Sequence, residues 1–176
     1  MPSQKELDKF FIETAQRISE FSKCQRLKVG AVITSNNRIV SCGYNGSPSG
    51  FINCNDPCAC GGMTFNWDNS AGALHHLFSE QFEIHAEMNA ILDMAKRGLS
   101  PEGCTLYTTI CPCKNCAKLV IASGIKRIVF NDYYYRDVEC KNLDNTEVNE
   151  LLFQELNGAD IIKLLGPRGI EIEKFS

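Results

Sequence analysis

The chain has 176 residues, of which 44% are hydrophobic and 22% charged, and its formal net charge is −3. This composition is typical of one globular domain, and the acidic balance disfavours duplex nucleic acid as a partner, since such binders usually carry a basic surface. No apolar run approaches the roughly 18 residues of a membrane span, and the N-terminal MPSQKELDKF lacks the features of a secretion signal, so we expect a single cytoplasmic domain over residues 1–176 and no membrane partner.

The first half of the chain begins with a predicted helix over residues 4–22. Ser3 and Glu6 are spaced as in a capping box at its start. Apolar residues then recur at helical spacing, namely Leu7, Phe10, Phe11, Ile18 and Phe21. Two β-rich runs on either side of residues 35–37 predict a hairpin. Residues 43–82 show no sustained period, and so long a loop in a compact domain is unusual unless it is functional or tied down.

Regular structure is predicted again in the second half. A helix from Ile84 stops at Gly98, a strand follows over 104–109, and a second helix stops at Gly124 before a further strand. This strand–helix–strand unit predicts a parallel strand pair with a crossover helix. The tail, roughly 146–176, predicts one or two helices and then a last strand in GIEIEKF. We therefore expect an α/β fold, a three-layer α/β/α sandwich around a mixed sheet of about five strands.

The cysteines suggest a metal site. Ten cysteines in a chain without a secretion signal favour metal ligands or catalytic groups over disulfides. Cys113 and Cys116 form a C-x-x-C after Pro112 at a helix start, so their sulfurs share one face. His85 starts the preceding helix. If the two helices lie side by side, His85, Cys113 and Cys116 converge. Three protein ligands with an open fourth position would define a catalytic zinc site. Glu87 would then lie beside the metal, where a carboxylate can move protons.

Each half of this pattern is weak alone. A C-x-x-C can be a redox pair or half of a zinc ribbon, and a His-x-Glu pair usually has no special role. Together, H-x-E on one helix and P-C-x-x-C on the next form the pattern of zinc-dependent nucleobase deaminases. We therefore predict that His85, Cys113 and Cys116 bind a catalytic zinc. Glu87 is the predicted general acid and base.

Four segments resemble the deoxycytidylate (dCMP) deaminases of the cytidine deaminase superfamily. They are CQRLKVGAVI (24–33), GYNGSPSG (43–50), EIHAEMNAIL (83–92) and YTTICPCKNCAKLVIASGIKRIVF (107–130). The resemblance runs from the first helix to about residue 136, and the first two segments narrow it from the superfamily to this branch. Cys111 departs from the family pattern, where another small residue is common, but it is not expected to replace a ligand.

The resemblance implies a fold of the cytidine deaminase type and hydrolysis of dCMP to dUMP and ammonia by a zinc-activated water, which supplies dUMP for thymidylate synthesis. It also implies the residues that read the substrate. Arg26 would meet the phosphate, assisted by Tyr133 or Tyr134. Asn45 would contact the sugar or the base, and the backbone N–H of Ala86 the base carbonyl. The plainer alternatives are that Arg26 is a solvated surface charge and that Asn45 begins a simple turn.

Relatives of this kind are commonly activated by dCTP and inhibited by dTTP, and they assemble as hexamers. A glycine-rich loop suits triphosphate binding because its exposed N–H groups can approach phosphates closely. The expected regulatory site therefore lies in residues 44–50 at a subunit boundary, with Mg²⁺ accompanying the triphosphate. Its expected residues are Tyr44, Gly46, Ser47 and Gly50. The expected assembly is a homo-oligomer, a hexamer by resemblance.

A second, structural zinc is also expected, because some phage relatives hold one with a Cys, Cys, His, Glu set. The matching positions are Cys24, Cys54, His75 and Glu83. Such a closed site would explain how the long loop stays ordered. Rival ligands are Cys58, Cys60 and His76. The plainer alternative is that these cysteines are small buried apolar residues.

Other functions remain open at this stage. A deaminase of tRNA, of a free nucleoside or base, or of single-stranded DNA would share the zinc pattern, although nucleic-acid substrates usually demand a basic surface. A zinc-stabilised module that senses nucleotides without catalysis would have no need of Glu87. A thiol–disulfide redox protein would leave His85 and Glu87 unexplained.

Overall fold

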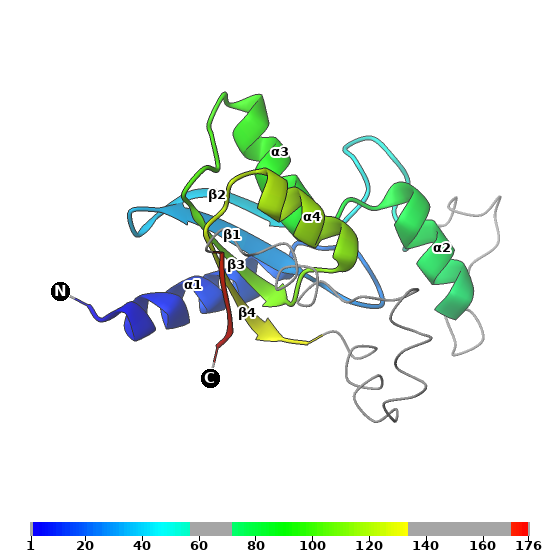
Figure 1. The fold of residues 1–176 in the computed structure, drawn as a ribbon. Coiled ribbons are helices and arrows are strands. Elements are labelled where there is room, and N and C mark those ends of the chain that lie inside the picture. The colour runs from blue at the N-terminus through cyan, green and yellow to red at the C-terminus, as the bar shows by residue number, and fades with distance from the viewer. Residues whose placement is uncertain (1, 57–71, 134–169, 176) are drawn as a thin grey trace, which may run out of the picture.

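The computed structural model describes residues 2–56, 72–133 and 170–175. Nine elements occur in these ranges in the order α1 (Gln4–Ser19), β1 (Gly30–Ser35), β2 (Arg38–Tyr44), α2 (Gly72–Phe82), α3 (Ala86–Lys96), β3 (Thr105–Ile110), α4 (Lys114–Ala122), β4 (Arg127–Asp132) and β5 (Glu171–Lys174). Helices α3 and α4 lie on one side of a sheet and α1 on the other (Figure 1). The expected three-layer α/β/α fold is confirmed.

The sheet is mixed, as expected, with strand order β2-β1-β3-β4-β5. Strand β1 runs antiparallel to β2 and β3, whereas β3, β4 and β5 are parallel. The predicted strand–helix–strand unit is therefore the parallel pair β3–α4–β4. In the predicted hairpin, Asn36 and Asn37 have φ values of 49° and 59°. Two positive φ values in succession are typical of the tight hairpin turn that best matches the twist of the two strands.

Alternating side chains of the strands supply two separate cores. On one face, Ile33 and Leu106 pack among residues of α3 and α4, including Ala90 and Val120. On the other face, Val32, Tyr107 and Val129 pack against α1, which contributes Phe11, Ile12 and Ala15. Each helix layer is thus fixed to the sheet by its own apolar cluster, and this holds the starts of α3 and α4 close together.

Helix α1 differs from its prediction in two respects. Its capping box is present, with Ser3 N donating to Glu6 Oε2 over 2.7 Å, but the helix ends at Ser19 because the next bonds span only three residues. Phe10 and Phe21, expected in the apolar stripe, are 56% and 66% exposed. Phe21 lies beyond the helix end and stacks on Tyr44 instead, with ring centroids 6.0 Å apart.

The interval expected to be a loop, residues 43–82, contains a helix, α2. Hydrophobic periodicity does not reveal this helix. A polar pattern indicates it instead, because the polar residues His75, Ser79 and Glu83 recur every four residues. The expected helices of residues 146–176 fall largely outside the described residues, but the expected last strand is present as β5.

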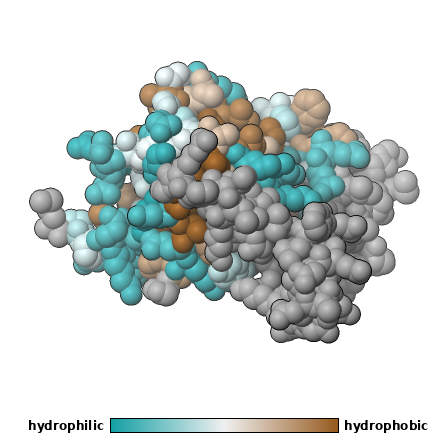
Figure 2. All heavy atoms as spheres, viewed as in Figure 1, coloured by the Kyte–Doolittle hydropathy of each residue, from teal (hydrophilic) through white to brown (hydrophobic). Residues whose placement is uncertain are grey.

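In the described part of the chain, no helix has both the length and the apolar character that a membrane crossing requires. Hydrophilic residues cover much of the face around α1, whereas a hydrophobic area lies over α3 (Figure 2). On α3 and the turn that follows it, Leu92 and Leu99 are 45% and 43% exposed.

Candidate functional site

The first candidate metal centre lies where α3 and α4 begin. His85 is the N-cap residue of α3, and Cys113 is the N-cap residue of α4. Both have extended backbone conformations, and the Cys113 sulfur accepts a hydrogen bond from Cys116 N. Strand β2 packs closely against the start of α3. A Cβ on Gly43 would lie 2.4 Å from the carbonyl oxygen of Ala86. Only glycine allows this packing.

The ligand atoms of this centre converge. His85 Nδ1 lies 3.5 Å from Cys113 Sγ and 3.4 Å from Cys116 Sγ, and all three atoms lie within 4.8 Å of one another. Zinc binds nitrogen at about 2.0–2.1 Å and sulfur at about 2.3 Å, so ligands in a tetrahedral arrangement are roughly 3.5 Å apart. The three residues therefore fit a zinc ion by chemistry and by distance.

The pKa shifts at this centre favour a thiolate at Cys113 and an imidazolium at His85. The hydrogen bond from Cys116 lowers the pKa of Cys113 to about 3, although burial acts against it. The same contact raises the pKa of Cys116. The hydrogen bond with Cys113 raises the pKa of His85 to about 9, again against burial. An anionic sulfur at a helix N-terminus is stabilised by the helix dipole and is the form that binds metals.

Glu87 lies in the first turn of α3 and is only 3% exposed. Burial raises the pKa of this carboxyl group, whereas the nearby His85 lowers it. Its interaction with Cys116 also lowers the pKa of Glu87, so the carboxyl group borders the metal centre without being one of its three converging ligands. A buried carboxyl group beside a Lewis-acid site can accept and return a proton.

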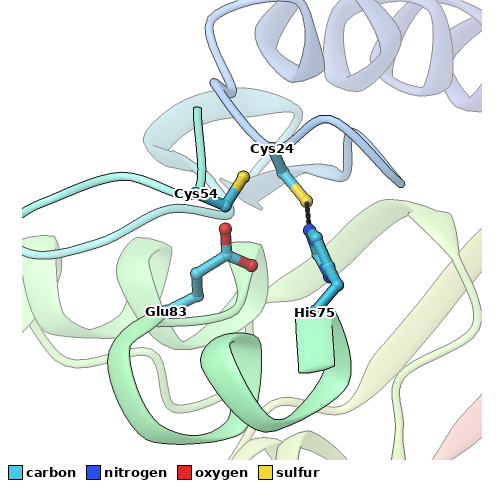
Figure 3. Close-up of side chains that lie close together, drawn as sticks. All are labelled: Cys24, Cys54, His75 and Glu83. Atoms are coloured by element: carbon cyan, nitrogen blue, oxygen red, sulfur yellow. Dashed lines mark hydrogen bonds between the residues drawn. The ribbon is translucent and has the colours of Figure 1, made fainter. Parts of the chain in front are cut away.

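A second group of potential ligands includes Glu83, two residues before His85, and Figure 3 shows its side chains turned toward a common centre. Cys24, Cys54, His75 and Glu83 place one ligand atom each within 4.8 Å of the others. Cys24 Sγ is 3.4 Å from His75 Nε2, and Ser79 Oγ donates to Glu83 Oε2 over 2.7 Å. Four converging ligands with a supporting hydroxyl describe a closed, structural metal site.

The electrostatics of this second group are similar. The hydrogen bond from Cys54 lowers the pKa of Cys24 to about 5, and it raises the pKa of Cys54. Burial raises the pKa of Glu83, and the Ser79 hydrogen bond opposes it. Of the rival ligands, Cys58 and Cys60 lie outside the described residues. The side chain of His76 on α2 is not described either.

The residues predicted to read the substrate lie on separate segments of the chain. Arg26 is exposed in the segment between α1 and β1. Tyr133 follows β4, where its ring packs on Phe130 at a centroid distance of 5.0 Å and lies 5.3 Å from Lys174 Nζ. Ala86 is the buried first residue of α3. Tyr134 lies outside the described residues.

Asn45 is buried and has structural partners. Its Oδ1 accepts from Val29 N over 2.8 Å, and its Nδ2 donates to Leu27 O over 2.9 Å. The amide thereby ties the end of β2 to the segment that enters β1. A carboxamide has further hydrogen-bonding capacity beyond these two bonds, so its predicted contact with substrate stays a prediction.

Of the predicted regulatory residues, Tyr44 and Gly46 adjoin the start of α3. Tyr44 ends β2 and is 44% exposed, and Gly50 has a φ of 87°. Gly46 pairs with Ile84, one residue before His85. Within the described residues, Ser47 Oγ is buried and has no hydrogen-bond partner, and a buried polar atom of this kind usually requires a ligand or water.

Sequence reasoning missed one feature of the site. It is Asn89, whose Nδ2 donates to Tyr44 O over 2.8 Å and also contacts Ile84 O at 3.4 Å. Cys111, which was expected not to replace a ligand, is buried with Phe130 beside the P-C-x-x-C turn and is not one of the three converging residues. No local pattern could reveal the role of Asn89, because its partners lie on separate segments.

The comparison with known protein families identifies this architecture. Residues 5–132 match the family described as "Cytidine and deoxycytidylate deaminase zinc-binding region". The match covers both candidate metal centres and the sheet from β1 to β4. The chain therefore belongs to the cytidine and deoxycytidylate deaminase family.

Individual relatives are similar over most of their length. The deoxycytidylate deaminase of Enterobacteria phage T4 is 35% identical, over 83% of this chain and 94% of that protein. Its counterpart from phage T2 is 40% identical over 70% of this chain and 78% of that one. The crystal structure of dCMP deaminase from cyanophage S-TIM5 in complex with dCMP and dUMP is 30% identical, covers 98% of this chain and 99% of that chain, and has a TM-score of 0.66.

Proposed function

We propose that this protein hydrolyses dCMP to dUMP and ammonia. The observation that carries the proposal is the convergence of His85 Nδ1 on the sulfurs of Cys113 and Cys116 at 3.5 and 3.4 Å, with the buried carboxyl group of Glu87 beside them. The substrate is supported by the phage deaminases, which are similar to this chain over most of its length. We further propose that residues 1–176 act as one domain.

In this proposal, His85, Cys113 and Cys116 hold a zinc ion. When bound, zinc supplies a Lewis acid that makes water nucleophilic near neutral pH. The oxygen of water adds to C4 of the cytosine ring and the C4–N4 bond breaks. Both water protons are used: one remains on N3 of the product uracil, and the other leaves with the amine as ammonia.

Glu87 carries these protons. It accepts one from the attacking water and delivers it to N3, and it then passes the second to the departing amino group. Its burial excludes bulk water from this path. The N–H of Ala86, at the positive end of α3, donates to the base carbonyl and orients the ring.

We assign substrate recognition to residues outside the group of three converging ligands. The Arg26 guanidinium pairs with the phosphate dianion, since charge-assisted bonds to phosphate are the strongest available. Tyr133, or Tyr134 next to it, adds a hydroxyl to that contact. The amide of Asn45 meets the sugar or the base with the capacity left by its two backbone bonds.

The second group of ligands is proposed to hold a structural zinc. Cys24 follows α1, Cys54 follows β2, and His75 and Glu83 lie on and directly after α2, so the four ligands come from three separate segments. A metal ion bound by them would join these segments, much as a disulfide joins two. The convergence of four ligand atoms within 4.8 Å supports this assignment.

Regulation by dCTP as activator and dTTP as inhibitor is proposed to use the loop of residues 44–50, with Mg²⁺ accompanying the triphosphate. The buried and unpaired hydroxyl of Ser47 supports a ligand at this loop, and its glycines allow close contact with phosphates. A homo-oligomer, by resemblance a hexamer, would place this loop at a subunit boundary.

A deamination assay that follows the ultraviolet absorbance of cytosine tests the proposed reaction. The zinc-loaded protein is given dCMP or deoxycytidine, each with and without dCTP. Turnover of dCMP but not of deoxycytidine is the expected result, because only the nucleotide carries the phosphate that Arg26 is proposed to bind. Turnover of neither compound would overturn the proposal and favour a nucleotide-sensing role.

A further inference from the structure

The two candidate metal centres are adjacent along the chain. Glu83 belongs to the second centre and His85 to the first, so the single residue Ile84 separates a ligand of one from a ligand of the other. A shift of Ile84 must therefore move at least one ligand. The way in which Ile84 is held decides whether the two centres act independently.

Ile84 is held by three hydrogen bonds, two with Gly46 and one from the Asn89 side chain. Its N–H donates to Gly46 O over 2.9 Å, and its carbonyl accepts from Gly46 N over 3.1 Å. The same carbonyl lies 3.4 Å from Asn89 Nδ2, which also donates to Tyr44 O over 2.8 Å. We call this set, the Gly46–Ile84 pair with the Asn89 side chain, the Ile84 clamp. It fastens the entry of α3 to the end of β2.

The clamp also connects to Cys24 on the far side of the second centre. Asn45, next to Gly46, binds Leu27 and Val29 through its side chain. Its carbonyl accepts from Ser22 Oγ over 2.8 Å, and Ser22 Oγ in turn accepts from Cys24 N over 3.2 Å. Two routes thus join the second centre to Ile84: the covalent one from Glu83 and the hydrogen-bonded one from Cys24.

We propose that the Ile84 clamp couples the two centres, so that a metal ion held by Cys24, Cys54, His75 and Glu83 raises the affinity of the His85 centre for its own ion. Asn89 is the positioning residue of this coupling. The proposal rests on the two zinc sites of the proposed function. An ion in the second centre restricts the motion of Glu83 and Cys24, and through the clamp it also restricts Ile84. His85 then loses less conformational entropy when it binds the ion of the first centre.

Coupling of this kind is reciprocal. If the second ion raises the affinity of the first centre by some factor, the first ion raises the affinity of the second by the same factor. Couplings in proteins are typically about 5- to 150-fold. We expect about 10-fold here, since the connection is short and consists mainly of backbone hydrogen bonds.

Zinc release to a chromophoric chelator measures both affinities without reference to activity. The oligomeric wild-type protein should release two ions per chain in two phases. Two variants assign these phases: Cys113→Ser leaves only the second centre, and Cys54→Ser leaves only the first. The expected result is that each variant lowers the affinity of the remaining centre about 10-fold. If Cys54→Ser fails to fold, Glu83→Gln removes a ligand of the same centre with a side chain of equal size.

The role of Asn89 is tested in the same assay. In Asn89→Ala, which suits a helix, removal of the second centre should change the first centre's affinity by about threefold instead of about 10-fold, because the Asn89 contacts are lost while the Gly46–Ile84 backbone pair remains. Leu92→Ala, an exposed change on the same helix, should retain the full factor. A general loss of stability would not change this ratio.

Two results would overturn the proposal. One is equal affinity of the first centre with and without the second ion. The other is binding of only one ion per chain, which would remove the second centre as well. Turnover of dCMP by such a one-ion protein would leave the proposed reaction standing, so the two failures are distinguishable.

Discussion

The Asp8 carboxylate on α1 and the Arg127 guanidinium on β4 form a two-pronged ion pair, with both nitrogen–oxygen distances at 2.8 Å. Tyr107 on β3 donates a further bond to Asp8 over 2.7 Å, and Asp8 is only 7% exposed. Arg127 also pairs with Glu173 on β5. One buried charge therefore joins the helix layer to the sheet and to its last strand.

Asp8→Asn is expected to remove an acid-sensitive part of the stability. Burial works to raise the pKa of Asp8, but the bonds from Arg127, Tyr107 and Gln4 outweigh it and hold the pKa below its ordinary value of 3.8. A lowered folded pKa stabilises the protein above the unfolded value, and this contribution disappears as the pH falls through the folded pKa. Urea unfolding of wild type and variant should differ most at pH 6 and converge toward pH 2.

Breaking a buried ion pair by removing one partner costs about 3–5 kcal/mol, and we expect a loss at the lower end because asparagine still accepts one bond. Glu13→Gln serves as control, since Glu13 on the same helix is exposed and lies 3.9 Å from the exposed Lys9. The expectation fails if both variants show the same change with pH.

Glu87→Gln should strongly reduce turnover without loss of metal. The amide keeps the size of the side chain but cannot carry the proton, so kcat should fall by about 10²–10⁴-fold. Zinc content and thermal stability should stay close to wild type, because Glu87 is not one of the three converging ligands. Glu102→Gln, a change at an exposed ion pair with Lys126, should leave kcat unchanged. Full activity of Glu87→Gln would exclude the assigned role.

The starts of α3 and α4 were the most predictable part of the molecule. Local spacing determines which helix turn carries His85 and which carries Cys113, and the parallel β3–α4–β4 unit leaves little choice in where those turns lie. The burial of the aromatic residues in α1 was less predictable. Phe10 and Phe11 are neighbours, and only contacts with the sheet decide that Phe11 is buried and Phe10 exposed.

Helix α2 and the role of Asn89 could not be inferred from apolar patterning. The stripe of α2 that faces inward is polar, since His75 and Ser79 point to the second centre. Asn89 acts on the carbonyls of Tyr44 and Ile84. Main-chain carbonyls carry no sequence information, so a side chain that binds them can be found only in three dimensions.

His75→Ala should lower the zinc content from two ions per chain to one, whereas His76→Ala should keep both. His75 Nε2 lies 3.4 Å from Cys24 Sγ, and the neighbouring histidine on the same helix is the matched control. Loss of an ion that binds only the folded state should lower the melting temperature by about 6–10 °C. Elemental analysis and thermal unfolding measure both quantities. Loss of an ion in His76→Ala instead would exchange the two assignments.

Arg26→Ala should raise the KM for dCMP by about 10- to 100-fold, because a hydrogen bond to a charged group contributes about 1.5–3 kcal/mol and each 1.4 kcal/mol is a factor of ten. The value of kcat should change much less, since the phosphate is distant from the reacting carbon. Lys28→Ala is the matched control: it removes an exposed cation two residues further along the same segment. If Arg26 only contributed general positive charge, both variants would raise KM equally and high salt would remove the difference from wild type. An increase confined to Arg26→Ala and retained in high salt would instead indicate a direct contact with the phosphate.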